Sequence, residues 1–377
     1  IPDFSWKNNS PRTKNSNRLI MELFWYIIIA IVFAVFFILD GYDFGTGIIH
    51  LFFAKEEKDK VVIAKAAGLF WDSNEVWLVV AGGMLFMAFP TFYASVFSGF
   101  YLPLMLVLWF IIFRAIGLEL RSQFNFQMWK DIWDKAFGVS SLLLTLFFGV
   151  ALGNVIRGVN LGGVENGVSA YEGHYFFLPL WDSSFSPQGI HPGVIDWFTI
   201  VIGLIAVVTL TIHGANWVIL KTNSSINEKL KSVIIKLNIA LVALTIFSIS
   251  IWHIIKPQPF SNFTENPLLF IFPMIYLSGL VGIFFIKKYQ KDIYAFVCSS
   301  LLILGGISSS LASMFPVILP STNDVNESLT IYNTAASHYG LSVAMGWGII
   351  GFILLFVYMI IQKRIMKGKV DHMDYGH

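Results

Sequence analysis

Residues 67–99, AGLFWDSNEVWLVVAGGMLFMAFPTFYASVFSG, decide the fold of this chain. Residues 66–89 are apolar apart from a short polar interruption, and at ~1.5 Å per residue they are long enough to cross a bilayer as a helix. Two carboxylates inside such a segment cost about 2.5–3.5 kcal/mol each on insertion scales, so Asp72 and Glu75 need a partner, a proton or a function. Because they are spaced i, i+3, we expect their oxygens on one helix face.

The composition is that of a membrane protein with little material outside the bilayer. The chain has 377 residues, of which 56% are hydrophobic and 13% are charged, whereas a soluble domain has about 25% charged residues. The net charge of +2 comes from scattered residues and indicates no nucleic-acid partner. The single cysteine, Cys298, excludes an internal disulfide, a CxxCH haem attachment and a cysteine-ligated iron–sulfur cluster.

Nine apolar segments of ~20 residues predict an all-α polytopic membrane protein, a bundle of about nine transmembrane helices. They cover roughly residues 23–42, 66–89, 94–116, 136–156, 193–220, 233–254, 267–286, 292–315 and 340–362. We expect one transmembrane domain over residues 21–377. Residues 1–20 are polar and precede Met21, so we interpret them as a leader or an expression remnant outside the fold.

Basic residues lie in alternate connections between these segments. The basic connections and the tail contain Lys55, Lys58, Lys60, Lys65, Arg114, Arg121, Lys130, Lys135, Lys221, Lys229, Lys231, Lys236, Lys287, Lys288, Lys291, Lys363, Arg364, Lys367 and Lys369. The positive-inside rule then places these connections and the C-terminus in the cytoplasm, and the start of the first span outside. With this orientation, the carboxylates of the first two spans, Arg114 and His213 gather in the cytoplasmic third of the membrane.

The stretch LDGYDFGTG, residues 39–47, carries two further carboxylates at the end of the first segment. It is not a calcium loop, because the twelfth position from Asp40 is Leu51 rather than Glu. Gly41 and Gly45 form a small-xxx-small pair, which favours close packing of a neighbouring helix. For Asp40 and Asp43 we favour a functional site or a buried pairing with Arg114 over a solvated helix end.

Two interpretations of Asp72 and Glu75 stay open on the residues alone. They could be a helix-end pair that reaches the headgroups, or a functional site from which Trp71 and Trp77 exclude much of the water. A poorly hydrated carboxylate pair exchanges protons as a coupled unit, which suits a proton relay. We favour the second interpretation.

The lone intramembrane His213 indicates packing more than a relay or ligand role, although a polar relay is kept as a hypothesis. No axial ligand pair is evident, so we expect no haem bound by this chain alone. Arg157, at the outer end of the fourth segment, is predicted to extend to the membrane interface; a quinone or lipid contact is the alternative.

Six motifs make the chain similar to subunit II of cytochrome bd-type quinol oxidases, in order along the sequence. They are LDGYDFGTG, FWDSNEVWLVVAGG, FSGFYLPL, FRAIGLELR, GNVIRGV and ASMFPVILPSTNDVNESLTI. The resemblance covers nearly all residues after Met21, and the WDxNEVWL block followed by AGG and FSGFY is its most specific part.

The resemblance implies a haem-free, nine-span subunit that pairs pseudo-symmetrically with a subunit I holding two haems b, haem d and the quinol site. The complex would oxidise ubiquinol or menaquinol and reduce O₂ to water in the bacterial cytoplasmic membrane, with cytoplasmic protons. A small accessory subunit and a structural quinone or lipid are further expected partners.

The family's WDxN aspartate, here Asp72, lies on a proposed proton route towards subunit I, and Asp43 lies near it. We predict that Asp72 and Glu75 take up protons, that Asp40 and Asp43 are their polar neighbours, and that Arg114 is the charge partner. A proton-coupled secondary transporter using the same carboxylates is the alternative function. A purely structural scaffold for subunit I is a third.

Overall fold

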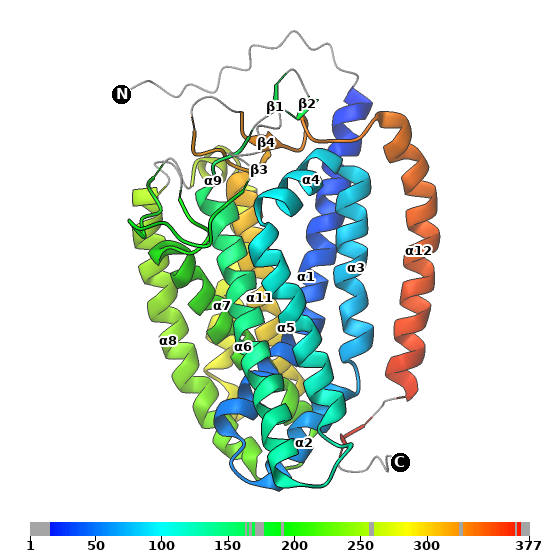
Figure 1. Cartoon of the computed structure of the whole chain (residues 1–377), viewed down its shortest axis with the longest axis vertical. Helices are drawn as coiled ribbons and strands as arrows, with labels where there is room; N and C mark the ends of the chain where they lie inside the picture. The colour runs from blue at the N-terminus through cyan, green and yellow to red at the C-terminus, as the bar shows by residue number, and fades with distance from the viewer. Residues whose placement is uncertain are drawn as a thin grey trace.

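The computed structural model describes residues 16–162, 164–165, 168–169, 177–189, 192–255, 260–323, 327–365 and 368–370. These residues form an elongated bundle in which the long helices run along one common axis (Figure 1). The strands and helix α4 lie at one end of the bundle, which we call the loop end. Helix α2 lies at the opposite end, which we call the α2 end.

Seven helices of the described chain are long and apolar enough to cross a membrane. They are α1 (Ser16–Phe53), α5 (Tyr101–Leu120), α6 (Gln127–Arg157), α7 (Trp197–Lys221), α8 (Ile226–Ile255), α11 (Ile293–Met314) and α12 (His338–Ile365). The pair α3 (Trp71–Ala88) and α4 (Pro90–Gly99) forms an eighth candidate span if the two are counted together. The predicted segment at residues 267–286 contains η1 (Pro267–Phe270) and α10 (Ile271–Ile283), which together are shorter. The all-α polytopic fold is therefore confirmed, with roughly the predicted number of helices.

The remaining elements are short and lie at the two ends of the bundle. They are α2 (Glu57–Gly68), α9 (Ser261–Glu265), η2 (Ile286–Lys288), β1 (Val164–Glu165), β2 (Val168–Ser169), β3 (Val317–Leu319) and β4 (Leu329–Thr330). The strands pair as two antiparallel ladders, β1 with β2 and β3 with β4.

The prediction that residues 66–89 form one continuous helix is wrong. Helix α2 ends at Gly68 and α3 begins at Trp71, so Asp72 lies in the first turn of α3. The chain then bends by 119° between α3 and α4. Pro90, the first residue of α4, has no backbone N–H with which to continue the α3 hydrogen-bond ladder.

Two predicted boundaries of the first span also differ from the structure. The span was predicted to end near residue 42, but α1 continues to Phe53, so Asp40 and Asp43 lie about three turns before its end. Helix α1 begins at Ser16, within the predicted leader, and the rest of that leader, residues 1–15, lies outside the described residues.

Helix α1 is the centre of the bundle and packs against α3, α6, α7, α11 and α12. Its residues 40–50 are all buried. A Cβ atom on Gly45 would lie 1.8 Å from the Leu210 carbonyl oxygen, and one on Gly214 would lie 2.2 Å from the Gly45 carbonyl carbon. The two backbones of α1 and α7 therefore touch, which confirms the packing role predicted for Gly45.

Helix α12 is the loosest part of the bundle. It stands beside α3 at the edge of the molecule (Figure 1), and no residue of its most apolar stretch is buried. An apolar cleft of about 610 Å³ separates α12 from α1 and α3, lined among others by Trp25, Gly83, Trp347 and Gly351. Large apolar side chains also cover the outer faces of α3, α5 and α12, which is the surface of a protein that meets lipid or another membrane subunit.

Candidate functional site

The buried guanidinium of Arg114, on α5, lies among carboxylates from α1 and α3. Its Nη1 donates to Asp40 Oδ1 at 3.1 Å, and its Nη2 lies 3.4 Å from Glu75 Oε2. The side chains of Arg114 and Asp40 are 2% and 0% exposed, and that of Glu75 is 19% exposed. The guanidinium carbon also lies 4.7 Å from the centre of the Phe44 ring, a cation–π contact.

Asp43 lies three residues after Asp40 on α1 and is held by Asn74, two residues after Asp72 on α3. The Asn74 amide nitrogen donates to Asp43 Oδ2 at 2.7 Å and to the Tyr42 hydroxyl at 2.6 Å. It also lies 3.2 Å from the Leu39 carbonyl oxygen, so one amide ties the start of α3 to the middle of α1. We call Asp40, Asp43, Glu75 and Arg114 together the Arg114 cluster.

The Arg114 cluster is short of hydrogen bonds and rich in negative groups. Among the described residues, Asp40 Oδ2, Asp43 Oδ1 and Glu75 Oε1 are buried without a hydrogen-bond partner, as are Arg114 Nε and Nη2. One guanidinium offsets one carboxylate, so the other two carboxyl groups require a proton or another cation to be held in a low dielectric. The arrangement is that of a group able to bind and exchange protons.

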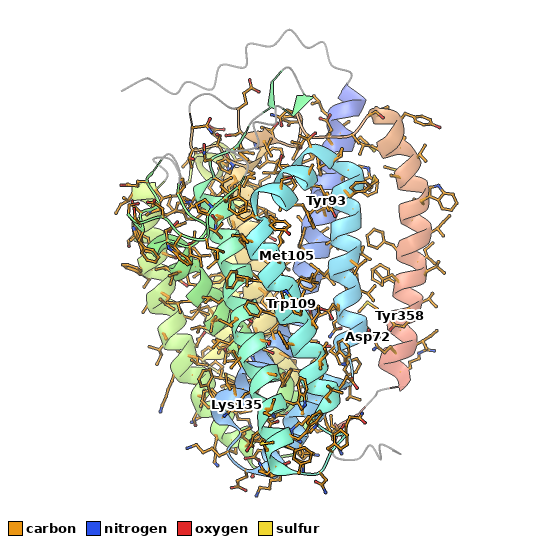
Figure 2. All side chains as sticks on the ribbon, in the orientation of Figure 1. Asp72, Tyr93, Met105, Trp109, Lys135 and Tyr358 are labelled. Carbon is orange, nitrogen blue, oxygen red and sulfur yellow. The ribbon has the colours of Figure 1, made fainter. Side chains whose placement is uncertain are left out.

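Asp72 lies outside this buried group. Its side chain is exposed at the end of α3 nearer α2, where Figure 2 labels it. Glu75 follows one turn later and reaches the guanidinium, while Asp40 and Asp43 are fully buried. The four predicted carboxylates therefore form a series from an exposed carboxylate through a partly exposed one to two buried ones.

His213, the predicted relay candidate, lies on α7 apart from the carboxylates. Its Nδ1 lies 2.8 Å from the Ser299 hydroxyl and its Nε2 lies 2.8 Å from the Ile38 carbonyl oxygen. Its ring stacks on Phe296 at 4.7 Å between centres. Both ring nitrogens are thus engaged within the bundle, which is the arrangement of a packing histidine.

The described residues contain no cluster of metal-binding side chains. No group of three or more His, Cys, Asp or Glu side chains in that part of the chain is placed to hold a metal ion. A haem iron needs an axial nitrogen or sulfur that is free to coordinate, and both nitrogens of His213 already have partners. His213 is therefore not free to act as an axial haem ligand in this arrangement.

A second polar group, not predicted from the sequence, lies at the α2 end. Asp134 on α6 accepts from Arg121 Nε and from Lys60 Nζ at 3.0 Å, and lies 3.1 Å from His50 Nε2. Arg121 also donates to Glu57 at 2.9 Å. This Asp134 group ties α1, α2, α5 and α6 together. Its members come from four separate stretches of sequence, so no local pattern indicated it.

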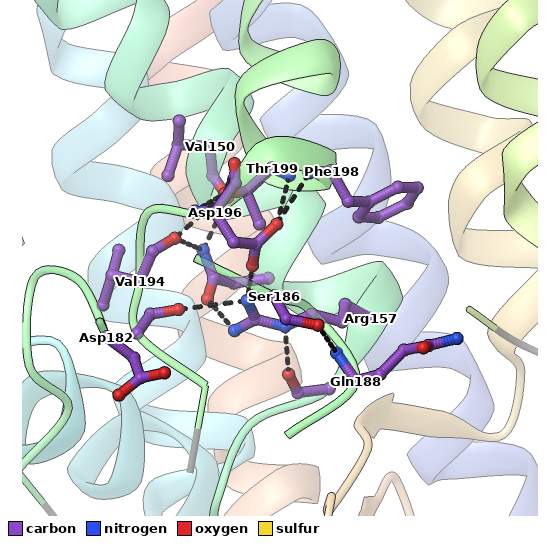
Figure 3. Close-up of polar contacts among 12 residues, drawn as sticks. Val150, Arg157, Asp182, Ser186, Gln188, Val194, Asp196, Phe198 and Thr199 are labelled. Carbon is purple, nitrogen blue, oxygen red and sulfur yellow. Dashed lines mark hydrogen bonds and ion pairs between the residues drawn. The ribbon is translucent and has the colours of Figure 1, made fainter. Parts of the chain in front are cut away.

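A third polar group lies at the loop end, and there the prediction for Arg157 is wrong. Arg157 does not extend to the interface: its side chain is 1% exposed and pairs with Asp196, which is also 1% exposed. The guanidinium further donates to the Gly158 and Gly193 carbonyl oxygens, each at 3.0 Å, and to Asn154 Oδ1 at 2.6 Å (Figure 3). We call this set of contacts the Arg157 group.

Asp196 holds the Arg157 group to the start of α7. Its other oxygen accepts from the backbone N–H groups of Phe198 and Thr199, at 2.7 and 2.9 Å, and the Thr199 hydroxyl accepts from the Asp196 N–H (Figure 3). This is a reciprocal capping box, and the spacing D-x-x-T at residues 196–199 was its only sequence signal.

Comparisons with known proteins agree with this architecture. The family model described as cytochrome bd terminal oxidase subunit II matches residues 21–366. The chain belongs to the cytochrome bd terminal oxidase subunit II family. Its members form a quinol oxidase complex, an oxidoreductase, so the family implies a partner subunit I and haems within that complex. The resemblance inferred from the motifs is therefore confirmed.

Individual relatives cover nearly the whole chain. A probable cytochrome oxidase subunit 2 of Haemophilus influenzae is 27% identical, over 93% of this chain and 95% of its own length. The cytochrome bd-I ubiquinol oxidase subunit 2 of Escherichia coli K12 is also 27% identical, over 93% and 97%. The fold is similar to a chain of the bd oxidase structure from Geobacillus thermodenitrificans, with a TM-score of 0.65 at 11% identity, covering 93% of this chain and 98% of that one.

Proposed function

We propose that this chain is the haem-free subunit of a quinol oxidase that supports subunit I and carries cytoplasmic protons towards it through the Arg114 cluster. The observation that carries the proposal is the graded exposure of the four carboxylates. Asp72 is exposed, Glu75 is partly exposed, and Asp40 and Asp43 are fully buried beside a guanidinium. Such a series can collect a proton at the surface and pass it inward.

The roles within this proposal follow from the contacts. Asp72 collects protons, and Glu75 moves them from the surface to the guanidinium. Asp40 and Asp43 hold them inside the bundle, and Asn74 fixes the orientation of Asp43 by donating to its Oδ2 at 2.7 Å. Arg114 lowers the cost of the buried negative charge without itself giving up a proton. Haem and quinol chemistry is supplied by subunit I, and reduction of O₂ to water consumes the protons.

The proposed orientation places the α2 end in the cytoplasm. Lys60, Arg121 and Lys130 lie there, together with the end of α12, while the start of α1 lies at the loop end. An accumulation of basic residues at one membrane face favours the cytoplasmic side. The described N-terminal end would then be outside and the C-terminal end inside.

The apolar cleft between α12 and α3 is the place that best fits a structural quinone or lipid. Its described lining is almost entirely apolar, and Gly83 and Gly351 leave open space beside the two helices. Gly83→Leu with Gly351→Leu would fill that space and should lower the amount of lipid or quinone that copurifies with the complex, measured by mass spectrometry after extraction. Unchanged extracts would refute this location.

The main proposal is tested by Asp43→Asn in the assembled complex, with Asp196→Asn as its matched control. Both changes keep the side-chain shape and remove one buried carboxylate. We expect Asp43→Asn to lower quinol oxidation per haem about tenfold, which corresponds to ~1.4 kcal/mol in the rate-limiting barrier. Asp196→Asn should lower the yield of complex and leave the turnover of each assembled complex unchanged. Equal turnover in the two variants would refute the proton route.

A further inference from the structure

The last described residues, Gly368–Val370, fold back against the α2 end of the bundle (Figure 1). Val370 is 2% exposed and belongs to a buried apolar cluster with Tyr42, Ala66, Leu69, Phe70 and Trp217. A short segment outside the long helices is normally solvated unless contacts hold it down. Burial of Val370 therefore indicates a specific docking of this segment.

Lys369 anchors the segment at the end of α7. Its Nζ donates to the Thr222 carbonyl oxygen at 2.9 Å and lies 3.4 Å from the Ile219 carbonyl oxygen. The last carbonyl groups of a helix have no partner within it and carry partial negative charge, so an ammonium group is well placed there. Asp292, which precedes α11, lies 3.4 Å from the same ammonium, and Lys221 donates to the Gly368 carbonyl oxygen at 3.3 Å.

The docked segment shares a buried apolar cluster with residues that support the Arg114 cluster. Tyr42, in the same apolar cluster as Val370, stacks on Trp217 with 3.9 Å between ring centres. The Tyr42 hydroxyl accepts from Asn74, the residue that also donates to Asp43. Tyr42 and Trp217 thus form a stacked layer that links the apolar cluster of Val370 to the amide that holds Asp43.

We propose that Gly368–Val370 is a cap that seals the α2 end of the bundle and keeps water away from Asp43 on that side. The Tyr42–Trp217 layer lies behind the cap, and the exposed approach to the cluster runs instead past Asp72 and Glu75. Lifting the cap would expose the apolar cluster around Ala66 to water and open a second approach to Asp43. The seal against water does not depend on the proposed function. The consequence for Asp43 does, because it requires that Asp43 carries protons.

Labelling of a buried cysteine with a charged, water-soluble methanethiosulfonate tests the seal in the purified heterodimer. Cys298→Ser removes the native thiol of this chain, and Ala66→Cys places a thiol at a fully buried position in the cluster of Val370. Val370→Asp puts a carboxylate into that apolar cluster and should release the cap. We expect labelling at Ala66→Cys to be at least about tenfold faster when Val370→Asp is present, as for a locally opened segment.

Ala88→Cys is the matched control, because Ala88 is equally buried but lies at the loop end. Its labelling should stay slow with and without Val370→Asp. If Val370→Asp does not assemble, Lys369→Ala is the second variant, because it removes the anchor and keeps Val370. It too should speed labelling at Ala66→Cys. An unchanged rate at Ala66→Cys in the assembled variants, or a parallel rise at Ala88→Cys, would overturn the cap.

Turnover separates failure of the cap from failure of the proton route. We expect Asp72→Asn to slow quinol oxidation in the capped complex and to slow it less when Val370→Asp opens a second approach. If Asp72→Asn has the same effect in both complexes, the opened cap provides no route to Asp43 and that part of the proposal is wrong. If Asp72→Asn has no effect in either complex while Ala66→Cys labelling still responds, the seal stands and the route through Asp72 fails.

Discussion

The Arg114 cluster and the Arg157 group each place an arginine and an aspartate in the buried interior, yet they are built in opposite ways. Among the described residues Arg157 has one carboxylate partner, and its other hydrogen bonds go to Gly158, Gly193 and Asn154. Arg114 faces three carboxylates, and its Nε lacks a hydrogen-bond partner among the described residues. A charge-balanced and hydrogen-bonded group stabilises a fold, whereas an excess of poorly bonded carboxylates costs stability. The second arrangement is the one expected of a site retained for function.

Removing Arg157 should have the largest effect on stability. Arg157→Ala leaves Asp196 charged, buried and without its cation, which costs about 3–5 kcal/mol. We expect a large fall in the thermal unfolding temperature of the purified complex and in its yield. Arg364→Ala, which removes an exposed arginine, is the control and should change neither. An Arg157→Ala complex as stable as that control would mean that the Arg157 group is not a structural support.

Removing Arg114 should lower turnover, and a second substitution at its partner Asp40 should not restore it. Arg114→Ala leaves the Arg114 cluster without its fixed cation, so we expect a loss of turnover per haem of about tenfold or more, together with weaker assembly. Adding Asp40→Asn removes one uncompensated charge and should restore assembly but not turnover. The corresponding pair Arg157→Ala and Asp196→Asn should stay unstable, because the carbonyls of Gly158 and Gly193 also lose a donor. Full turnover in the Arg114→Ala, Asp40→Asn complex would show that the Arg114 cluster is not needed for turnover.

Helices α1 and α7 are held together by direct backbone contact at Gly45 and Gly214. Gly45→Ala places a methyl group 1.8 Å from the Leu210 carbonyl oxygen, so the helices must move apart. Overpacking of this kind typically costs 1–3 kcal/mol, and we expect a lower unfolding temperature. Gly82→Ala, at a position with no heavy atom within 4 Å of the added carbon, is the matched control. Equal stability of the two variants would show that α1 and α7 adjust without cost.

Among these substitutions we expect the smallest effect from a change at Asp72, the exposed end of the carboxylate series. Asp72→Asn should slow turnover about two- to fivefold, which corresponds to ~0.4–1 kcal/mol in the barrier. Water can still reach Glu75, which is 19% exposed, so the loss should be smaller than for the buried Asp43. Haem content should be unchanged in a reduced-minus-oxidised spectrum. A loss larger than that of Asp43→Asn would place the limiting step at the surface and not in the Arg114 cluster.

The sequence predicted the helices and the partners of Arg114 because apolar segments, and the charged residues inside them, can be recognised directly in the sequence. Long apolar segments can only be helices in a bilayer, and Asp40 and Glu75 lie in spans that need a cation for their carboxylates. The pairing of Arg114 with Asp40 is confirmed at 3.1 Å. The functional roles of Asp40, Asp43, Asp72, Glu75 and His213 remain predictions.

Two features that the sequence did not reveal have no signal of this kind. Arg157 was expected at the interface because its partner Asp196 lies 39 residues further along, beyond a connection rich in glycine and proline. The break between α2 and α3 falls at Leu69 and Phe70, two apolar residues that give no local stop signal. The bend at Pro90 did have such a signal, since a proline within an apolar run commonly ends a helix.

Proton uptake by the Asp43→Asn complex during a single turnover tests the route through the Arg114 cluster most directly. The fully reduced heterodimer would be mixed with O₂, and proton uptake from the medium would be followed with a pH-indicating dye alongside the haem absorbance. If protons pass through the Arg114 cluster, the Asp196→Asn complex takes up protons at the rate of the unchanged complex. The Asp43→Asn complex takes them up about tenfold more slowly. Equal rates of proton uptake in all three complexes would contradict a route through the Arg114 cluster.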